Sequence, residues 1–139
     1  KWTAYAQAKT ANALFALALD IRYADQGLRA FSVHPGGIMT PLQRHLATEE
    51  MVALGWLGED GELSELAASL FKSTTQGCTT TLWAATSAML VGKGGLYCED
   101  CDVAPLADEN TPRYFGVAPW AVDSEQAERL WALSESAVA

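Results

Sequence analysis

Tyr5-Ala-Gln-Ala-Lys9 opens a long alanine-rich run that predicts an uninterrupted helix from Thr3 to Ala24. Because the phenol and the ammonium are four residues apart, they lie on one face of that helix, on adjacent turns. A positive charge beside a phenol stabilises the phenolate, which suits this tyrosine to donate and accept a proton near neutral pH. A surface tyrosine and lysine on an amphipathic helix explain the same five residues, so this stretch alone does not decide the function.

A second motif follows the glycine stop at Gly27. The apolar run 28–33 predicts a buried strand of a parallel sheet, and Pro35 ends it because proline has no N–H to give to a ladder. Gly36 and Gly37 can take backbone angles closed to other residues, which lets the main chain approach a flat ligand. The turn therefore lies at the carboxyl end of a strand, where ligands bind in open α/β sheets.

Together the two motifs resemble the short-chain dehydrogenase/reductase family, whose catalytic helix carries Y-x-x-x-K and whose next strand ends in P-G-x-x-x-T. Tyr5 and Lys9 match the first motif. Pro35, Gly36 and Thr40 match the second at the family's spacing. The residues that follow Lys9 are most similar to the retinol-dehydrogenase-like and protochlorophyllide-reductase-like branch.

The resemblance implies an α/β fold, namely the carboxyl-terminal half of a Rossmann-like doubly wound parallel sheet. We therefore expect a single partial domain, without the dinucleotide-binding half that carries the glycine-rich turn and the catalytic serine. The implied segments are a catalytic helix at 3–24, a strand and cofactor turn at 28–40, a substrate lid at 41–72, the last crossover helix and last strand at 74–99, and a carboxyl-terminal loop and helix at 104–137.

The resemblance also implies an NAD(P)-dependent oxidoreductase that acts on an alcohol or a carbonyl. Tyr5 would exchange a proton with the substrate oxygen, and Lys9 would hold the nicotinamide ribose. Thr40 would contact the nicotinamide carboxamide through its hydroxyl and backbone. The residues assigned to the cofactor are Lys9, Pro35, Gly36, Gly37, Ile38 and Thr40. Neither the substrate nor the choice between NAD and NADP can be read from these positions.

Three other interpretations stay open. An epimerase or dehydratase of the extended branch also uses a tyrosine and a lysine, although the motif from Pro35 to Thr40 favours the simple oxidoreductases. A non-catalytic cofactor-sensing or scaffold protein could share the fold. A helical interaction module with accidental motif matches is the third, and a parallel pair of strands at Leu28 and Leu96 would argue against it.

The segment 41–70 predicts two short helices joined by a glycine-rich hinge, with Thr48 and the two acids after it beginning one of them. By resemblance this segment is the substrate lid. Apolar side chains would line its inner surface and favour a hydrophobic substrate, although core packing explains them equally well. They are Met39, Leu42, Met51, Leu54, Trp56 and Leu57.

Two more helices are predicted downstream. Ser73 begins one that runs to about Ala88, and the stretch Gly92–Gly95 then turns into a strand at 96–98, not into the helix that a phosphate loop requires. Asp123-Ser-Glu-Gln126 predicts the cap of a terminal helix. Cys98 and Cys101 have the spacing of half a zinc site, but no second pair accompanies them, so we predict no metal.

The composition excludes several classes of function. A net charge of −8 argues against nucleic-acid binding, and no apolar stretch is long enough to span a bilayer. Three cysteines give no disulfide framework and favour a cytoplasmic protein. The partners we expect are a small-molecule substrate and, as the resemblance implies, a second copy packed through the small side chains of the first helix.

Overall fold

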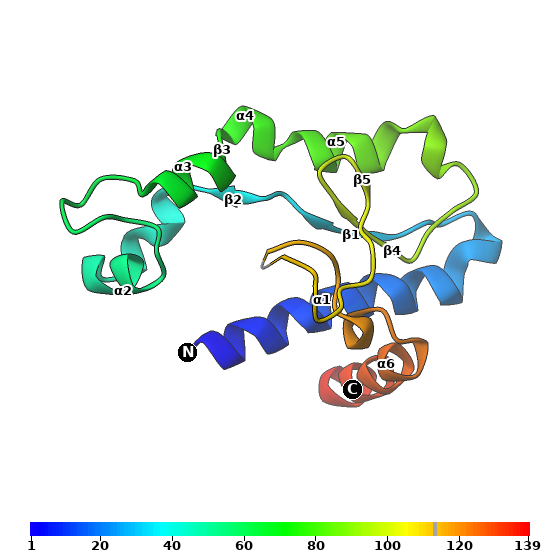
Figure 1. The fold of residues 1–139 in the computed structure, drawn as a ribbon. Helices are drawn as coiled ribbons and strands as arrows, with labels where there is room; N and C mark the ends of the chain where they lie inside the picture. Colours follow the sequence, from blue (N-terminus) through cyan, green and yellow to red (C-terminus); the bar gives the residue numbers. More distant parts are fainter. Residues whose placement is uncertain (113) are drawn as a thin grey trace.

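The computed structural model describes residues 1–112 and 114–139 and has a layered α/β architecture. Helix α1 (Trp2–Tyr23) covers one face of a small sheet, and α5 (Thr79–Thr86) covers the other (Figure 1). Helix α6 (Ser124–Val138) packs against α1. The sheet has three strands in the order β1 (Phe31–His34), β4 (Leu96–Glu99) and β5 (Asp102–Val103).

Strands β1 and β4 form the parallel pair that the fold requires. Their register runs from Phe31 opposite Leu96 to His34 opposite Glu99. The α/β class is thereby confirmed, and the interpretation as a purely helical module is wrong. The strand predicted at 96–98 is the last parallel strand, β4, and β5 follows it in an antiparallel hairpin that the sequence analysis missed.

Strand β1 begins at Phe31 and not at the predicted Leu28, because the residues before it are bound to the end of α1. The buried Asp20 carboxylate accepts two hydrogen bonds from Arg29, at 2.9 and 2.8 Å, and a third from the Ala30 amide at 3.0 Å. This cluster fixes the return of the chain from helix to strand. It also requires Gly94, where a Cβ would lie 1.8 Å from Asp20 Oδ1.

Three small apolar clusters hold the layers together. Strand alternation directs Phe31, Val33, Leu96 and Cys98 toward the cluster beneath α5. Tyr97 points the other way and packs with Ala13 of α1, Val117 and Ala121. The third cluster joins α1 to α6 and consists of Leu14, Ala18 and Ala127, with Leu17, Leu130 and Trp131 packed around it.

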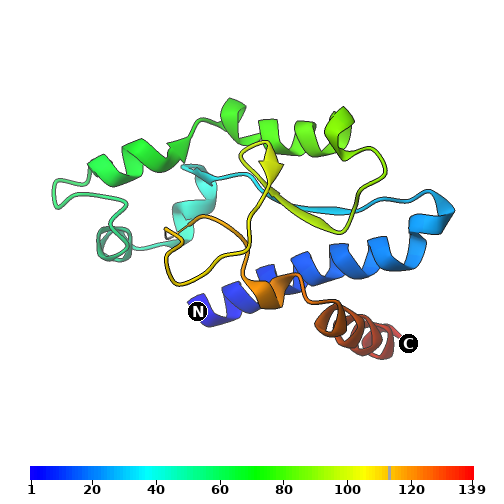
Figure 2. The ribbon, with the colours of Figure 1, turned by 45° about the vertical axis from the view of Figure 1, so that its right-hand side comes forward.

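The predicted lid is a helical excursion whose two ends meet. It contains a 3₁₀ turn (Pro41–His45), α2 (Thr48–Ala53) and α3 (Glu65–Leu70). Strand β2 (Gly37–Ile38) precedes it, and the last two residues of the predicted range 41–72 form β3 (Phe71–Lys72), which pairs with β2 in parallel. In Figure 2 the lid therefore extends from one end of the molecule as a separate lobe.

The segment after the lid begins with a capping box, in which Ser73 and Gln76 exchange hydrogen bonds between side chain and backbone. The single predicted helix is instead two, α4 (Thr74–Gly77) and α5, followed by a 3₁₀ turn at Ala88–Leu90. Near the end of the chain, after a 3₁₀ turn at Pro119–Ala121, Asp123 caps α6 by accepting a hydrogen bond from the Gln126 amide at 2.9 Å.

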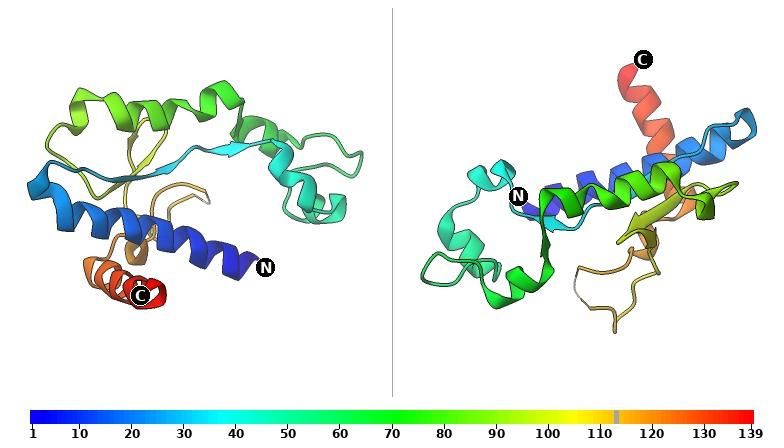
Figure 3. Two further views of the ribbon diagram at one scale, coloured as in Figure 1. Left: turned by 180° about the vertical axis from the view of Figure 1, so that it is seen from behind. Right: turned by 90° about the horizontal axis from the view of Figure 1, so that it is seen from above.

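Helix α6 crosses α1 on the side away from the sheet (Figure 3). Phe15 stacks on Trp131 with ring centroids 5.6 Å apart, and Arg22 lies over the same indole while pairing with Glu128. A helix of the same chain, α6, thus packs against the small residues of α1. In the described part of the chain, no helix has the length and apolar character needed to cross a membrane.

Candidate active site

Tyr5 and Lys9 belong to the face of α1 that is turned toward the sheet. Ala13, Ala16 and Asp20 continue that face at helical spacing, and all three are buried. The chain turns back from α1 into β1, so the start of α1 extends beyond the carboxyl ends of β1 and β4 (Figure 1). For this reason Lys9 and Tyr5 are exposed, Tyr5 by 53%. They lie beyond the end of the sheet at which β1 and β4 have their carboxyl ends, the end at which open α/β sheets generally bind ligands.

The phenol and the ammonium lie together, as the helical spacing predicts. Lys9 Nζ is 5.4 Å from the centroid of the Tyr5 ring, within the range of a cation–π contact. The Trp2 and Tyr5 rings also meet edge to face, with centroids 5.9 Å apart. Tyr5 is therefore held in place at an exposed position.

The start of α1 is tied to the lid. Lys1 Nζ lies 2.5 Å from Glu50 Oε2 of α2, and this hydrogen bond lowers the pKa of the Glu50 carboxyl. The pair places the first turns of α1 at the same end of the molecule as α2 and β2 (Figure 2). The start of α1, which carries Tyr5, and β2, which carries Gly37 of the predicted cofactor turn, thus lie at one end of the molecule.

The cofactor turn is covered on one side by the chain itself. A Cβ on Gly36, where φ is +90°, would lie 2.8 Å from Cδ of Lys72, and one on Gly37 would lie 2.8 Å from the Phe71 ring. The Ile38 side chain fits against Gly77 of α4, where a Cβ would lie 2.1 Å from it. Gly36 and Gly37 thus admit the side chains of β3 on this side, and Gly77 of α4 admits Ile38.

Thr40 has a structural role that the sequence analysis did not assign to it. Its hydroxyl accepts a hydrogen bond from the Leu42 amide at 3.2 Å, and its own amide donates to Gln43 Oε1 at 2.8 Å. Gln43 Nε2 in turn donates to the Ile38 carbonyl at 2.9 Å. Thr40 therefore caps the first turn of the lid and joins it to β2.

Tyr97 and Glu99 were missed by the sequence analysis and lie on the side of β4 that faces α1. Burial raises the pKa of the Tyr97 phenol, and the nearby Glu99 and Tyr5 add to that rise. The buried Glu99 carboxylate accepts a hydrogen bond from the Gly116 amide at 2.7 Å and so holds the loop after β5. The alternation of Leu96 and Cys98 with these two residues was the signal that could have identified them.

The cysteine pair is divided between the core and a turn. Cys98 is fully buried beneath α5. Cys101 lies in the turn between β4 and β5, and its amide donates to Thr80 Oγ1 at 3.2 Å. Residues 1–112 and 114–139 contain no group of three or more histidine, cysteine and acidic side chains placed to hold a metal ion.

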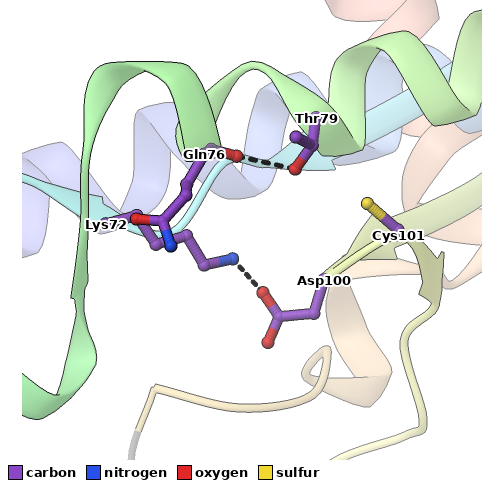
Figure 4. Close-up of a pocket in the computed structure, with 5 residues that line it drawn as sticks. All are labelled: Lys72, Gln76, Thr79, Asp100 and Cys101. Carbon is purple, nitrogen blue, oxygen red and sulfur yellow. Dashed lines mark hydrogen bonds and ion pairs between the residues drawn. The ribbon is translucent and has the colours of Figure 1, made fainter.

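A polar recess lies on the α5 side of the same end of the sheet (Figure 4). Lys72 of β3 and Asp100 of the β4–β5 turn form an ion pair across it. Gln76, Thr79 and Cys101 complete its lining. The residues that line this recess come from three segments that follow the predicted cofactor turn in the sequence, namely β3, the helices α4 and α5, and the β4–β5 turn.

Comparison with known proteins identifies relatives along almost the whole chain. The chain is 41% identical over 133 residues to "Short-chain dehydrogenase/reductase prx1" of Penicillium roqueforti, which covers 96% of this chain and 37% of that protein. It is 38% identical over 130 residues to "Probable oxidoreductase" of Streptomyces lividans, covering 94% and 43% of the two chains. It is 31% identical over 131 residues to "Retinol dehydrogenase 12" of Mus musculus, covering 94% and 34%.

No family model and no solved structure matches the chain. The chain spans about two fifths of the length of the first relatives that it matches. The compared segments cover 94–96% of this chain at 31–41% identity, and the relatives come from a fungus, a bacterium and a mammal. The chain belongs to the short-chain dehydrogenase/reductase family.

Proposed function

We propose that this chain carries the catalytic part of an NAD(P)-dependent oxidoreductase that interconverts an alcohol and a carbonyl. The observation that carries the proposal is the position of Tyr5 and Lys9. They are the two exposed members of a helix face that is otherwise buried against the sheet, and they lie beyond the carboxyl ends of its parallel strands. A phenol and an ammonium in that position suit proton transfer to a bound substrate.

The residues present fit a nicotinamide cofactor. The turn of Gly36 and Gly37 is filled by Lys72 and Phe71 on one side, so a planar ring would approach the backbone from the side of α1. The exposed Lys9 ammonium is free to donate hydrogen bonds to ribose hydroxyls. When bound, NAD(P) supplies or accepts the hydride.

Tyr5 would move the proton. In reduction its hydroxyl donates to the carbonyl oxygen, and in oxidation its phenolate accepts the alcohol proton. Lys9, with its ammonium 5.4 Å from the phenol ring centroid, would hold the nicotinamide ribose beside Tyr5. Thr40 would contribute its backbone to the carboxamide contact, because its hydroxyl already caps the lid.

The substrate that we propose is apolar. Leu42, Leu63 and Leu66 of the lid are exposed, as is Met39 just before it. Trp56, which the sequence analysis also placed on the inner surface, instead packs edge-on against Phe71 with ring centroids 5.6 Å apart. The remaining exposed side chains suit a hydrophobic substrate better than a charged one.

We further propose a cytoplasmic homo-oligomer whose subunits meet through α1. Ala4 and Ala8 remain exposed on α1 and permit the close approach of a second helix. All three cysteines are free thiols, which suits a reducing compartment.

Steady-state turnover of the complete protein tests the central proposal. Nicotinamide-dependent reduction of apolar aldehydes and ketones is measured for the parent protein, Tyr5→Phe and Tyr23→Phe. Loss of the general acid should lower kcat by about 10²–10⁴-fold in Tyr5→Phe. Tyr23→Phe removes a hydroxyl from the far end of the same helix and should keep the parent rate. Near-parent turnover by Tyr5→Phe would exclude the proposed proton transfer.

A further inference from the structure

We propose that Lys72 is a positioning residue for the cofactor turn, which it holds against the sheet through its ion pair with Asp100. The inference rests on the proposed function, because it takes the Gly36–Gly37 turn as the surface on which the nicotinamide lies. Lys72 itself would touch neither cofactor nor substrate. Its role follows from its contact with Gly36 and from its ion pair with Asp100, which Figure 4 shows as a dashed line.

The side chain of Lys72 lies directly over Gly36. A Cβ at Gly36 would come within 2.8 Å of Cδ, 3.0 Å of Cε and 3.2 Å of Nζ of this lysine. Three consecutive atoms of one side chain therefore follow the glycine, so the stem packs along the turn and does not cross it at one point. Because β3 pairs with β2, the backbone of Lys72 is also fixed opposite Ile38.

The far end of Lys72 is held by the tight turn between β4 and β5. The Asp100 carboxylate accepts a hydrogen bond from the Lys72 ammonium. Asp100 and Cys101 form the two-residue turn between β4 and β5. Their φ angles are +49° and +59°, in the left-handed region that favours glycine. The Cys101 amide donates to the fully buried Thr80 hydroxyl, so the turn is anchored in the layer of α5.

These contacts form one connection from the cofactor turn to the rigid sheet. Gly36 contacts the lysine stem, the ammonium contacts Asp100, and the turn of Asp100 is joined to β4 and α5. The ion pair is partly exposed, and such pairs contribute little to stability. Removing the charge should therefore leave the fold intact while it frees the cofactor turn to move.

The first test compares Lys72→Met, which keeps the stem and removes the charge, with Lys93→Met, which removes an exposed lysine charge far from the turn. In the complete protein, Lys72→Met should raise KM for the nicotinamide cofactor about 5-fold, with kcat changed less than about 2-fold and an unaltered Tm. Lys93→Met should match the parent in all three. A parent-like KM in Lys72→Met would overturn the proposal.

The partner is tested by a double-mutant cycle. Asp100→Asn should reproduce the KM increase, the double variant Lys72→Met with Asp100→Asn should be no worse than either single variant, and Lys72→Arg should recover most of the loss. Fully additive effects, or an Asp100→Asn variant with the parent KM, would show that Lys72 does not act through Asp100.

A measurement without cofactor separates this proposal from the proposed function. In amide NMR spectra of the complete protein, Lys72→Met should shift the Gly36 and Gly37 resonances, and Lys93→Met should leave them unchanged. Unshifted resonances would refute the positioning role even in an active enzyme. Shifted resonances in a protein that turns over no nicotinamide substrate would support the contact while the oxidoreductase proposal fails.

Discussion

At the scale of single residues, burial decides which ionisable groups are available for chemistry. Tyr5 is exposed beside Lys9, whereas Tyr97 is half-buried at the same end of the sheet and has a raised pKa. Two phenols on the α1 side of the molecule thus have opposite characters. Tyr5 is the phenol to which we assign proton exchange, whereas the raised pKa of Tyr97 favours its protonated form, which packs against Ala13.

The raised pKa of Tyr97 predicts a loss of stability in alkaline solution. Because the folded-state pKa lies above the reference of 10.0, the folded protein keeps a proton that the unfolded phenol releases. The contribution of Tyr97 to the free energy of unfolding is therefore fully retained below pH 10 and is lost as the pH rises through the folded-state pKa. Chemical denaturation at a series of pH values should show a shallower decline in Tyr97→Phe than in the parent protein.

Tyr23→Phe is the matched control for that prediction, since it leaves Tyr97 and its surroundings in place. It should retain the parent slope of the unfolding free energy against pH. An equal alkaline decline in Tyr97→Phe and the parent would contradict the assignment. The Cys98 thiol, whose pKa is also raised by burial, contributes a decline of the same sign from its reference of 9.0 and is present in all three proteins.

At the scale of elements, helix α6 uses a small residue to approach α1. Ala127 is fully buried between Leu14 and Ala18. Ala127→Leu would insert three carbon atoms into this contact and should lower the free energy of unfolding by about 1–3 kcal/mol. Ala132→Leu, on the exposed side of the same helix, should change it by less than about 0.5 kcal/mol. Thermal unfolding distinguishes the two, and equal effects would exclude the close packing.

The close pairing of β2 with β3 requires a residue without a side chain at Gly37. A Cβ there would lie 2.8 Å from two atoms of the Phe71 ring, whose other contact is Trp56 of the lid. Gly37→Ala should therefore destabilise the protein by about 1–3 kcal/mol. Adding Phe71→Leu makes room and should recover part of the loss. A double variant that is as unstable as the sum of both single variants would contradict a direct clash between these residues.

At the scale of the whole molecule, two features predict how the chain behaves by itself. Within the described residues β1 pairs with β4 alone, which leaves its other edge open for a further strand. The stretch Gly92–Gly95 leads into β4 and not into a helix, so it cannot cradle a diphosphate. The chain by itself should self-associate and bind dinucleotides only weakly.

Calorimetric titration of this chain with NADH and NADPH measures that weakness. We expect no binding tighter than about 100 μM for either cofactor, because the cofactor contacts that we propose for the described residues all lie at the nicotinamide. Light scattering on the same samples should show species larger than one chain. Micromolar binding by a monodisperse monomer would contradict both expectations.

The sequence was sufficient for features that local chemistry determines. The long helix of α1, the parallel strands β1 and β4, and the Asp123 cap follow from residue spacing and capping residues. Tertiary contacts determined what it did not reveal. The start of β1 depends on the hydrogen bonds to Asp20. The turn of the β4–β5 hairpin contains no glycine, so the sequence does not indicate a turn there.

In the candidate site, too, some residues were identified from the sequence and others only from the structure. Tyr5 and Lys9 were identified from a motif, because helical spacing alone brings them together. The contact of Lys72 with Gly36 and Asp100 joins residues far apart in the sequence and could not be foreseen. Glu99 and Gly116 are also joined by a hydrogen bond that only the folded chain reveals.

A crystal structure of the complete protein with bound NAD(P)⁺ tests the central claim most directly. The account predicts that the nicotinamide ring lies between the Tyr5 hydroxyl and the turn at Gly36 and Gly37, with Lys9 Nζ within about 3 Å of a ribose hydroxyl. A nicotinamide bound away from α1, or a Tyr5 hydroxyl directed away from the ring with no room for a substrate oxygen between them, would contradict it.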